Sequence, residues 1–434
     1  MQTITQLLSG ELKGSNSVKI SEDLETFPVA LFELADTLEY LDLSSNKLSA
    51  LPDDFNRFKK LKIFFASENL FTIFPQVLAK CEALEIIGFK SNQIESIPDD
   101  VFGPNLRWLI LTNNRIKVLP GTISQCEKLQ KLMLAGNQLT TLPVELSSCI
   151  NLGLLRISAN RLVQLPEWLL HLPNLAWLAF AGNNFEENFV YADVPNIDFE
   201  EISLGEMLGE GASGTIYRAR RKQGQSISDI AVKVFTGEVT SDGYPEQEMN
   251  AYIAAGNHHA VVKLIGKINL SEERKQGLVM ELIPMDFFNL GRPPSLQSCT
   301  RDVFSDELKI SSSQLLSISR SMASVGMHLH SRGLLHGDLY AHNILINENG
   351  ETLFGDFGAA SFYNKSDLVK SSLLEKIEVK AYGYLLDDLC SICSVDQSPL
   401  ISQVKSLARE CLNTTGSFRP SFEEIVKRLE SFKD

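Results

Sequence analysis

The chain has 434 residues, enough for two or three domains that each bury their own core. A hydrophobic fraction of 44% and a charged fraction of 22% are ordinary for a globular protein, and no apolar run reaches the roughly 18 residues that a membrane helix needs. The net charge of −14 argues against nucleic acid as a partner, because phosphate binding requires a basic surface.

The amino-terminal residues and the cysteines predict a protein of the cytoplasm. The stretch MQTITQLLSG lacks the basic start and the long apolar core of a secretory signal. Seven cysteines at irregular spacings are typical of reduced, buried thiols. Cys390 and Cys393 form a CxxC pair, but no second pair or histidine follows at the spacing of a zinc site, so we expect a structural role for them.

The first half of the chain is a repeat. The phrase LEYLDLSSNKLSALP at residues 38–52 opens seven clear copies, of which the last is partial. One asparagine per copy stands 22 or 23 residues after the previous one, at Asn46, Asn69, Asn92, Asn114, Asn137, Asn160 and Asn183. An earlier phrase, VKISEDLETFP at residues 18–28, is a degenerate copy that fits an end cap.

Each fixed position of the repeat has a structural reason. The two leucine-type residues of LxLxxN alternate inward from a short strand, and neighbouring copies must stack to bury them. The asparagine side chain can bond backbone groups left open by the turn, and the proline that follows fixes φ. The pattern resembles the leucine-rich-repeat family over roughly residues 12–190. That resemblance implies a curved solenoid domain, residues 1–190, that binds protein.

The outward strand positions of the repeats are unusually apolar. Besides Tyr40, they include Ile63, Phe65, Ile86, Trp108, Ile110, Met133, Leu154 and Trp177. An apolar concave face of this kind indicates that it is covered, either by a protein substrate or regulator or by the chain's own second half. We expect Trp108 and Trp177 to anchor this surface. The alternative, that some of these rings only stack on one another, stays open.

The second half begins after a short acidic link, residues 191–198. The segment LGEGASGTIYRAR carries a GxGxxG motif, which by itself also marks dinucleotide-binding folds. Residues 215–217 are β-branched and aromatic, so we expect the glycines in the turn of a hairpin instead of before a helix. The apolar strand IAVKVF at residues 230–235 then contains Lys233, whose burial requires anionic partners.

Two further motifs complete an ordered set: HGDLYAHNILI at residues 336–346 and LFGDFGAA at residues 353–360. Glycine loop, strand lysine, D-x-x-x-x-N and DFG in this order resemble the protein-kinase family. The end, CLNTTGSFRPSFEEIVKRL at residues 411–429, resembles the tyrosine-kinase-like group in a non-receptor form. The resemblance implies a bilobal α/β domain, residues 199–434, with a small β-rich lobe and a large helical lobe, which uses ATP and Mg²⁺.

The resemblance also implies a role for each motif residue. Lys233 would hold the α- and β-phosphates and pair with Glu248, for which Glu246 is the substitute. Asp338 would be the catalytic base, and Asn343 with Asp356 would hold magnesium. The nucleotide pocket would comprise Gly209, Gly211, Gly214, Ile216, Ala231, Lys233, Met280, Glu281 and Ile283. We expect His336 to pack beneath the DFG motif.

Three positions depart from the family pattern. Gly337 replaces the arginine of HRD, which predicts activity that does not depend on phosphorylation of the activation segment. Tyr340 stands where serine/threonine kinases carry a lysine near the γ-phosphate. Only 22 residues separate Asp356 from Glu378, at which we expect the next long helix to begin, and the APE motif is missing.

These departures keep two other functions open. A short segment after HGDLxxxN also resembles small-molecule kinases of the aminoglycoside and choline type, and a pseudokinase scaffold is the third reading. The three-glycine loop, the AVK strand and the RPSF tail favour a protein kinase. The tail usually accompanies serine/threonine specificity, which we therefore expect.

Overall fold

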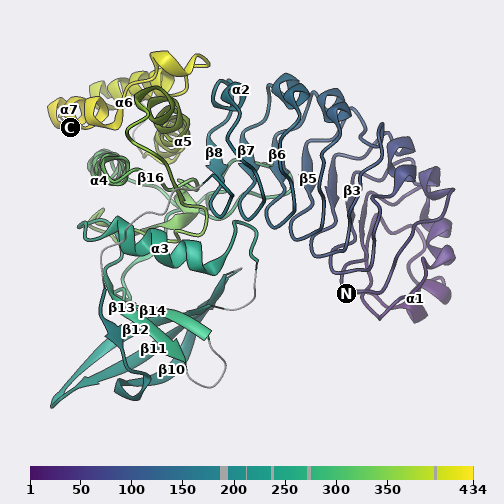
Figure 1. The fold of residues 1–434 in the computed structure, drawn as a ribbon, viewed down its shortest axis with the longest axis horizontal. Coiled ribbons are helices and arrows are strands. Elements are labelled where there is room, and N and C mark those ends of the chain that lie inside the picture. The colour runs from purple at the N-terminus through teal and green to yellow at the C-terminus, as the bar shows by residue number, and fades with distance from the viewer. Residues whose placement is uncertain (186–193, 212, 236–238, 271–274, 395–397, 434) are drawn as a thin grey trace. The chain divides into compact units, whose positions relative to one another are not determined.

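The chain forms two compact units in a computed structural model, which describes all residues except 186–193, 212, 236–238, 271–274, 395–397 and 434 (Figure 1). The first unit comprises Met1–Leu175 and Asn183–Phe185, and the second comprises Ala176–Gly182 and Glu186–Asp434. Residues 191–193 of the expected link lie outside the described residues.

The first unit is a stack of short coils, as the repeat predicts. Its three-residue strands pair in parallel in sequence order: β1 (Ser17–Lys19), β2 (Tyr40–Asp42), β3 (Ile63–Phe65), β4 (Ile86–Gly88), β5 (Trp108–Ile110), β6 (Lys131–Met133) and β7 (Leu154–Arg156). Helix α1 (Ile4–Leu8) precedes these strands and α2 (Glu167–Leu170) follows them. Short helical turns lie between the strands: η1 (Val29–Leu34), η2 (Phe55–Arg57), η3 (Gln76–Lys80), η4 (Gly121–Gln125) and η5 (Val144–Ser148). The predicted leucine-rich-repeat solenoid is confirmed.

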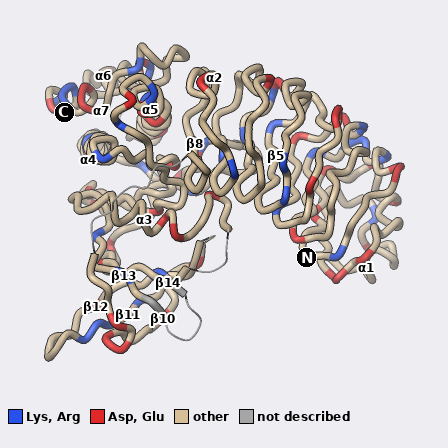
Figure 2. The backbone as a smooth tube through the Cα atoms, viewed as in Figure 1, with Lys and Arg blue, Asp and Glu red and all other residues tan. Residues whose placement is uncertain are grey.

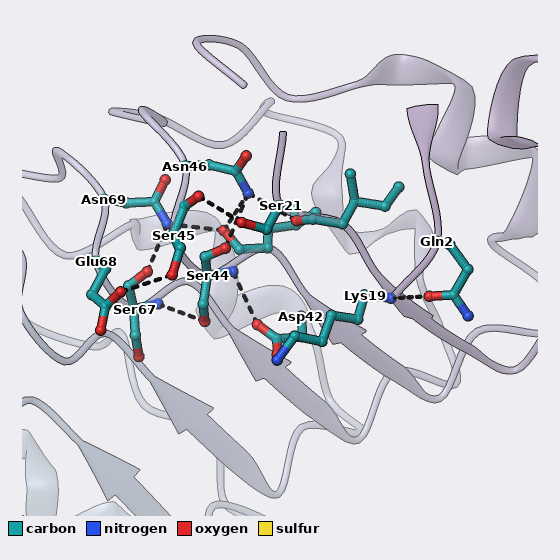
Figure 3. A network of polar contacts seen from close by, with 12 residues as sticks. Gln2, Lys19, Ser21, Asp42, Ser44, Ser45, Asn46, Ser67, Glu68 and Asn69 are labelled. Atoms are coloured by element: carbon teal, nitrogen blue, oxygen red, sulfur yellow. Dashed lines mark hydrogen bonds and ion pairs between the residues drawn. The ribbon is translucent and has the colours of Figure 1, made fainter. Parts of the chain in front are cut away.

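The asparagines of the repeat bind backbone groups of neighbouring coils, and Figure 3 shows the first two, Asn46 and Asn69. The Nδ2 atom of Asn46 donates to the carbonyls of Ile20 and Leu43 at 2.9 Å, and its Oδ1 accepts from the amide of Leu24 at 2.9 Å. Asn69 likewise donates to the Leu43 carbonyl at 2.9 Å. Each bond closes a turn that would otherwise leave a buried polar group unpaired, which is the role predicted for these residues.

Proline and phenylalanine shape the rest of each coil. Prolines precede five of the helical turns with φ between −73° and −64°, at Pro28, Pro75, Pro120, Pro143 and Pro166. Fully buried rings of Phe55, Phe64 and Phe89 touch across coils, with centroids 4.9 Å and 5.8 Å apart. The core of this unit is therefore partly aromatic as well as leucine-rich.

Charges of both signs are interspersed along the coils of the first unit (Figure 2). Equivalent positions of adjacent coils form ion pairs, for example Lys62 with Glu39 at 2.8 Å and Arg107 with Glu85 at 2.9 Å. These pairs are at least partly exposed, so each contributes little to stability.

The concave strand face is less exposed than we expected. Ile63, Phe65, Trp108, Ile110 and Met133 are half-buried, whereas Ile86 and Leu154 are buried. Ile86 is covered because its register partners on the flanking strands are Ile63 and Trp108. Phe65 lies over Gly88, whose added Cβ would stand 2.5 Å from the ring. Part of the apolar stripe therefore packs on itself, which is the alternative that the sequence left open.

The second unit has a small lobe built on a six-stranded sheet, ordered β10-β11-β12-β14-β13-β9. Its elements are β9 (Asn196–Ile197), η6 (Phe199–Glu201), β10 (Ile202–Glu210), β11 (Gly214–Gln223), β12 (Ser226–Phe235), α3 (Pro245–Ala255), β13 (Leu264–Leu270) and β14 (Lys275–Glu281). β9 joins β13 in parallel, and the remaining pairs are antiparallel. A core of Ile197, Ile230, Val232, Ile268 and Val279 holds the sheet.

The large lobe of the second unit is helical, so the predicted bilobal architecture is confirmed. Its helices are α4 (Ser312–Ser331), α5 (Leu368–Ile392), α6 (Pro399–Cys411) and α7 (Phe422–Ser431), with the turns η7 (Ala341–Asn343) and η8 (Gly416–Phe418). Short strands accompany them: β15 (Phe288–Asn289), β16 (Leu334–Leu335), β17 (Ile344–Ile346), β18 (Thr352–Phe354) and β19 (Ser361–Phe362). Arg419 of the RPSF motif is buried and donates to the carbonyls of Asn413 and Lys376 at 2.8 Å, which ties the tail to α5.

Strand β8 (Trp177–Ala179) carries the repeat motif but belongs to the second unit. All seven cysteines are buried free thiols, and burial raises the pKa of Cys81 to about 11. None of the helices within the described ranges combines the length and the apolar character needed to cross a membrane.

Candidate active site

The glycine motif forms the turn between two antiparallel strands, as predicted. β10 and β11 pair from Ile202↔Arg221 to Glu210↔Thr215, and the Gly211 amide donates to the Gly214 carbonyl at 2.9 Å. Gly214 cannot carry a side chain, because an added Cβ would stand 2.2 Å from the Val234 carbonyl oxygen of β12. A Cβ added at Gly209 would have no atom within 4 Å, and one added at Gly211 would meet only the Gly214 carbonyl oxygen at 3.9 Å, so the backbone of both residues is accessible to a ligand.

Lys233 and Glu248 form a buried ion pair. β12 carries Lys233 and α3 carries Glu248, whose side chain is 2% exposed. Burial opposes the charge of Lys233, but the carboxylates of Glu248 and Asp356 outweigh it and raise the pKa of the ammonium. Glu246, the substitute, is exposed. The lysine therefore stays charged beside two acidic groups.

Asp338 and Asn343 meet in the loop before β17. The Asn343 Nδ2 atom donates to the Asp338 carbonyl at 2.9 Å and to its Oδ2 at 2.8 Å. The turn η7 brings the two residues together because it closes the chain between them. His342 stands beside them, 3.9 Å from Asp338 Oδ2, and bonds Asp302 Oδ1 through Nδ1 at 2.7 Å.

The DFG motif lies against the same loop. Asp356 has φ of 56°, a left-handed conformation that costs a non-glycine residue about 1–2 kcal/mol and is held only by its surroundings. His336 is fully buried, bonds the Gly355 carbonyl through Nε2 at 3.0 Å, and packs 5.0 Å from Phe357. The structure thus places His336 under DFG, where we expected it.

Carboxyl groups from three segments converge near Gly358. A Cβ added there would stand 3.3 Å from Asp356 Oδ1 and 3.8 Å from both Glu248 Oε2 and the Asp242 Cβ. Asp242 also contributes to the raised pKa of Lys233, although its electrostatic effect ranks behind those of Glu248 and Asp356. Asp242 was missed from the sequence, and its only signal is a position shortly before α3.

Gly337 occupies a position that no other residue could take without movement of the backbone. Its φ is 73°, and an added Cβ would stand 2.6 Å from the Ala359 carbonyl oxygen and 2.7 Å from that of Leu178. Its amide donates to Glu378 Oε1 at 2.8 Å, and Glu378 Oε2 bonds His330 Nε2 at 2.8 Å. The arginine of an HRD motif is therefore excluded here by both conformation and space.

The helix expected to begin at Glu378 begins earlier. α5 starts at Leu368, so the expectation was wrong by ten positions, and Glu378 lies fully buried inside the helix. Asp367 caps the start by accepting from the Lys370 amide at 3.0 Å. This cap was not recognised in the sequence, and it leaves only residues 359–367 between DFG and α5.

Trp177, expected to anchor a face covered by a partner or by the chain's own second half, is buried among residues of the second unit. It is 2% exposed and lies between two tyrosines: Tyr340 at a centroid distance of 4.3 Å and Tyr384 at 5.2 Å. Its indole Nε1 donates to the Leu339 carbonyl at 3.2 Å. Tyr340 is therefore a packing residue in this structure, held parallel to the indole at 6°.

The residues of the expected adenine pocket lie along the inner strands of the small lobe. Ala231 of β12 pairs in register with Met280 of β14, and Ile216 of β11 pairs with Lys233. Met280 is buried, and Glu281 ends β14 with its side chain in an exposed ion pair with Lys263. Ile283 follows in the loop toward the large lobe. Their roles in binding adenine stay predictions.

Family models match segments in both halves of the chain. Residues 202–382 match the family model "Protein tyrosine and serine/threonine kinase". Residues 82–139 and 37–58 match two leucine-rich-repeat models. A leucine-rich-repeat protein of Leptospira interrogans has a solved structure that covers 41% of this chain and 51% of its own, at 28% identity and a TM-score of 0.35.

Curated relatives that are similar to part of the chain include proteins named as kinases. Tyrosine-protein kinase receptor TYRO3 of Danio rerio is 28% identical over 41% of this chain and 21% of its own length. Tyrosine-protein kinase Fer of Mus musculus is 30% identical over 42% and 20%. Inhibitor of nuclear factor kappa-B kinase subunit epsilon of Mus musculus is 27% identical over 42% and 27%. The chain thus spans 20–27% of the length of these relatives.

Proposed function

We propose that the chain is a leucine-rich-repeat protein kinase, because residues 202–382 match a protein-kinase model and residues 82–139 match a leucine-rich-repeat model, and that it transfers the γ-phosphate of ATP to serine or threonine hydroxyls of a protein. The observation that carries this proposal is the assembly of a buried Lys233–Glu248 pair and a bonded Asp338–Asn343 pair around the DFG loop. Phosphoryl transfer depends mainly on positioning and charge neutralisation, which these four groups supply.

Each group has a distinct task in the proposed reaction. The charged Lys233, held by Glu248, attracts phosphate oxygens. The carboxylate of Asp338, oriented by the Asn343 amide, accepts the proton of the attacking hydroxyl. The side-chain oxygens of Asn343 and Asp356 are hard donors that suit Mg²⁺, and the ion would neutralise charge on the phosphate oxygens.

The choice of serine and threonine rests on the RPSF tail alone. The relatives do not decide it, because they include named tyrosine kinases. Phosphoamino-acid analysis of a labelled protein mixture tests this choice directly. Phosphotyrosine alone would contradict it while leaving the protein-kinase proposal intact. The buried free thiols support the further proposal that the chain works in the reducing cytoplasm.

The test of the activity uses the full chain with Mg²⁺, labelled ATP and a protein mixture. Asp338→Asn should abolish labelling and leave nucleotide affinity within a few-fold, because the base acts on the hydroxyl and not on ATP. Asp306→Asn, an exposed aspartate of the same lobe, is the matched control and should label normally. Wild-type labelling that survives Asp338→Asn would overturn the assignment.

Two other outcomes would replace the proposal with its alternatives. Phosphate transfer to choline or an aminoglycoside, but not to protein, would indicate a small-molecule kinase. Nucleotide binding without transfer to any acceptor would indicate a pseudokinase scaffold. The same labelled ATP and the same protein preparation serve all three arms, so the readouts compare directly.

We further propose that the concave face of the repeats binds the protein substrate. Its half-buried stripe includes Trp108, over whose ring the Lys131 ammonium lies at 4.1 Å. A buried interface tryptophan contributes about 2 kcal/mol or more, so Trp108→Ala should raise KM for the protein substrate roughly thirtyfold. KM for a short peptide should not change. Val118→Ala, at a side chain that is 70% exposed, is the control, and equal effects of both variants would refute the proposal.

A further inference from the structure

Trp177 lies at the centre of a stack of rings that ends at the catalytic loop. The Tyr384 ring of α5 stacks on the Trp177 indole with an interplanar angle of 16°, and the Tyr340 ring stacks on the indole with an interplanar angle of 6°. Beyond Tyr340, the His342 ring follows at 5.0 Å. The stack therefore runs from the middle of α5 to the residue before Asn343.

The far end of the stack is fixed by charge. The Arg301 guanidinium lies 4.7 Å from the centre of the Tyr384 ring. The same guanidinium binds Asp387 at 3.2 Å and also Asp388. The Tyr384 ring thus contacts both a paired cation and the indole of Trp177.

The backbone around Trp177 touches both segments that flank the active site. The Leu178 carbonyl approaches Gly337, directly before Asp338, closely enough that no Cβ fits. The Phe180 amide donates to the hydroxyl of the buried Ser361, in the segment after DFG, at 2.9 Å. One stretch of chain, residues 177–180, therefore contacts the residues before the base, after the base and after DFG.

We propose that Trp177 is a positioning residue for the catalytic loop. Its side chain holds Leu339 and Tyr340 in place, and these residues in turn position the carboxylate of Asp338. The proposal rests on the proposed kinase activity. In this chain the indole supplies what Gly337 cannot: a fixed contact that sets the loop without a phosphorylated activation segment. Misplacement of a catalytic group by about 1 Å can cost a hundredfold in rate, so a lost contact next to Asp338 should be visible in kcat.

The bonds of Trp177 separate two kinds of substitution. Trp177→Phe keeps an aromatic ring between the tyrosines and removes only the N–H that donates to Leu339. Trp177→Leu removes the ring and the donor together. We expect kcat to fall about threefold to tenfold in the first variant and about a hundredfold in the second, with ATP affinity within threefold of wild type in both. Partial rescue by phenylalanine is the mark of positioning by stacking.

The experiment compares these variants of the full chain with Trp168→Phe and Trp168→Leu, at a half-buried tryptophan of α2. Hydrogen exchange of residues 336–343 is measured beside kcat. Exchange in this loop should rise at least tenfold in Trp177→Leu and stay unchanged in the Trp168 pair. If Trp177→Leu does not fold, Trp177→Phe and Tyr384→Leu give the same two readouts.

Each outcome decides between the two proposals. Unchanged loop exchange, or kcat per folded molecule equal to wild type, overturns the positioning role. A parallel loss of kcat, ATP affinity and folded fraction also overturns it, because that pattern marks a structural residue. A wild-type chain that transfers no phosphate would refute the kinase function. Hydrogen exchange of residues 336–343 alone would then test whether Trp177 positions the loop.

Discussion

Replacing Gly337 by alanine adds a single methyl group at the most confined point of the candidate site. With φ at 73°, the substitution costs about 1–2 kcal/mol from the left-handed conformation alone. The new Cβ would also stand 2.6 Å and 2.7 Å from the carbonyl oxygens of Ala359 and Leu178, so backbone must move. Overpacking of this kind costs about 1–3 kcal/mol more. We therefore expect the second unit to lose about 2–5 kcal/mol of stability.

Gly224 provides a control that separates the two costs. It has φ of 63° in the turn between β11 and β12, and no atom lies within 4 Å of an added Cβ. Gly224→Ala should therefore show only the conformational cost of about 1–2 kcal/mol. The difference between the two variants, about 1–3 kcal/mol, measures the close approach of the backbone to Gly337.

The assay is urea unfolding of the full chain, followed by hydrogen exchange in peptides from α4 and α5. These helices report the large lobe without interference from the repeats. The free energy of unfolding should be lower for Gly337→Ala than for Gly224→Ala by more than 1 kcal/mol. Equal values would show that Leu178 and Ala359 do not confine position 337, and the explanation for the missing arginine would fail.

Three further results are expected. Glu248→Gln should leave the buried Lys233 without its carboxylate and lower kcat/KM roughly a hundredfold, which corresponds to about 3 kcal/mol of transition-state stabilisation. A loss below tenfold in steady-state kinetics would contradict this. Ser366→Ala and Ser372→Ala, at exposed serines after DFG, should keep turnover within threefold, whereas a hundredfold loss would restore control by phosphorylation. Burial lowers the pKa of His258 from 6.5 to about 4, so the unfolded chain binds more protons between these values and stability should fall as pH drops through them. His258→Gln should remove about 1 kcal/mol of that fall in acid unfolding curves, since the ring is partly exposed, and an unchanged slope would refute the assignment.

The repeat and the order of the kinase motifs could be predicted from the sequence because their causes are local. An asparagine every 22 or 23 residues fixes one turn per coil, and its bonds reach only the adjacent coils. The hairpin at the glycine loop follows from β-branched residues next to glycines, again over a few positions. Lys233 in an apolar strand required an acidic partner, and the structure supplies Glu248.

The tertiary structure decided what depends on contacts between distant segments. Trp177 and Leu339 are 162 residues apart, and no periodicity could decide whether a partner or the chain's own second half covers the indole, which stacks on Tyr340 and Tyr384. The start of α5 also differed from expectation. Asp367 caps the beginning of the helix, and Glu378 lies well inside it, where its buried carboxylate accepts the bond from the Gly337 amide. Burial of a side chain depends on which segments meet in space. The sequence by itself shows only which side chains are apolar, so that their burial stabilises the folded chain.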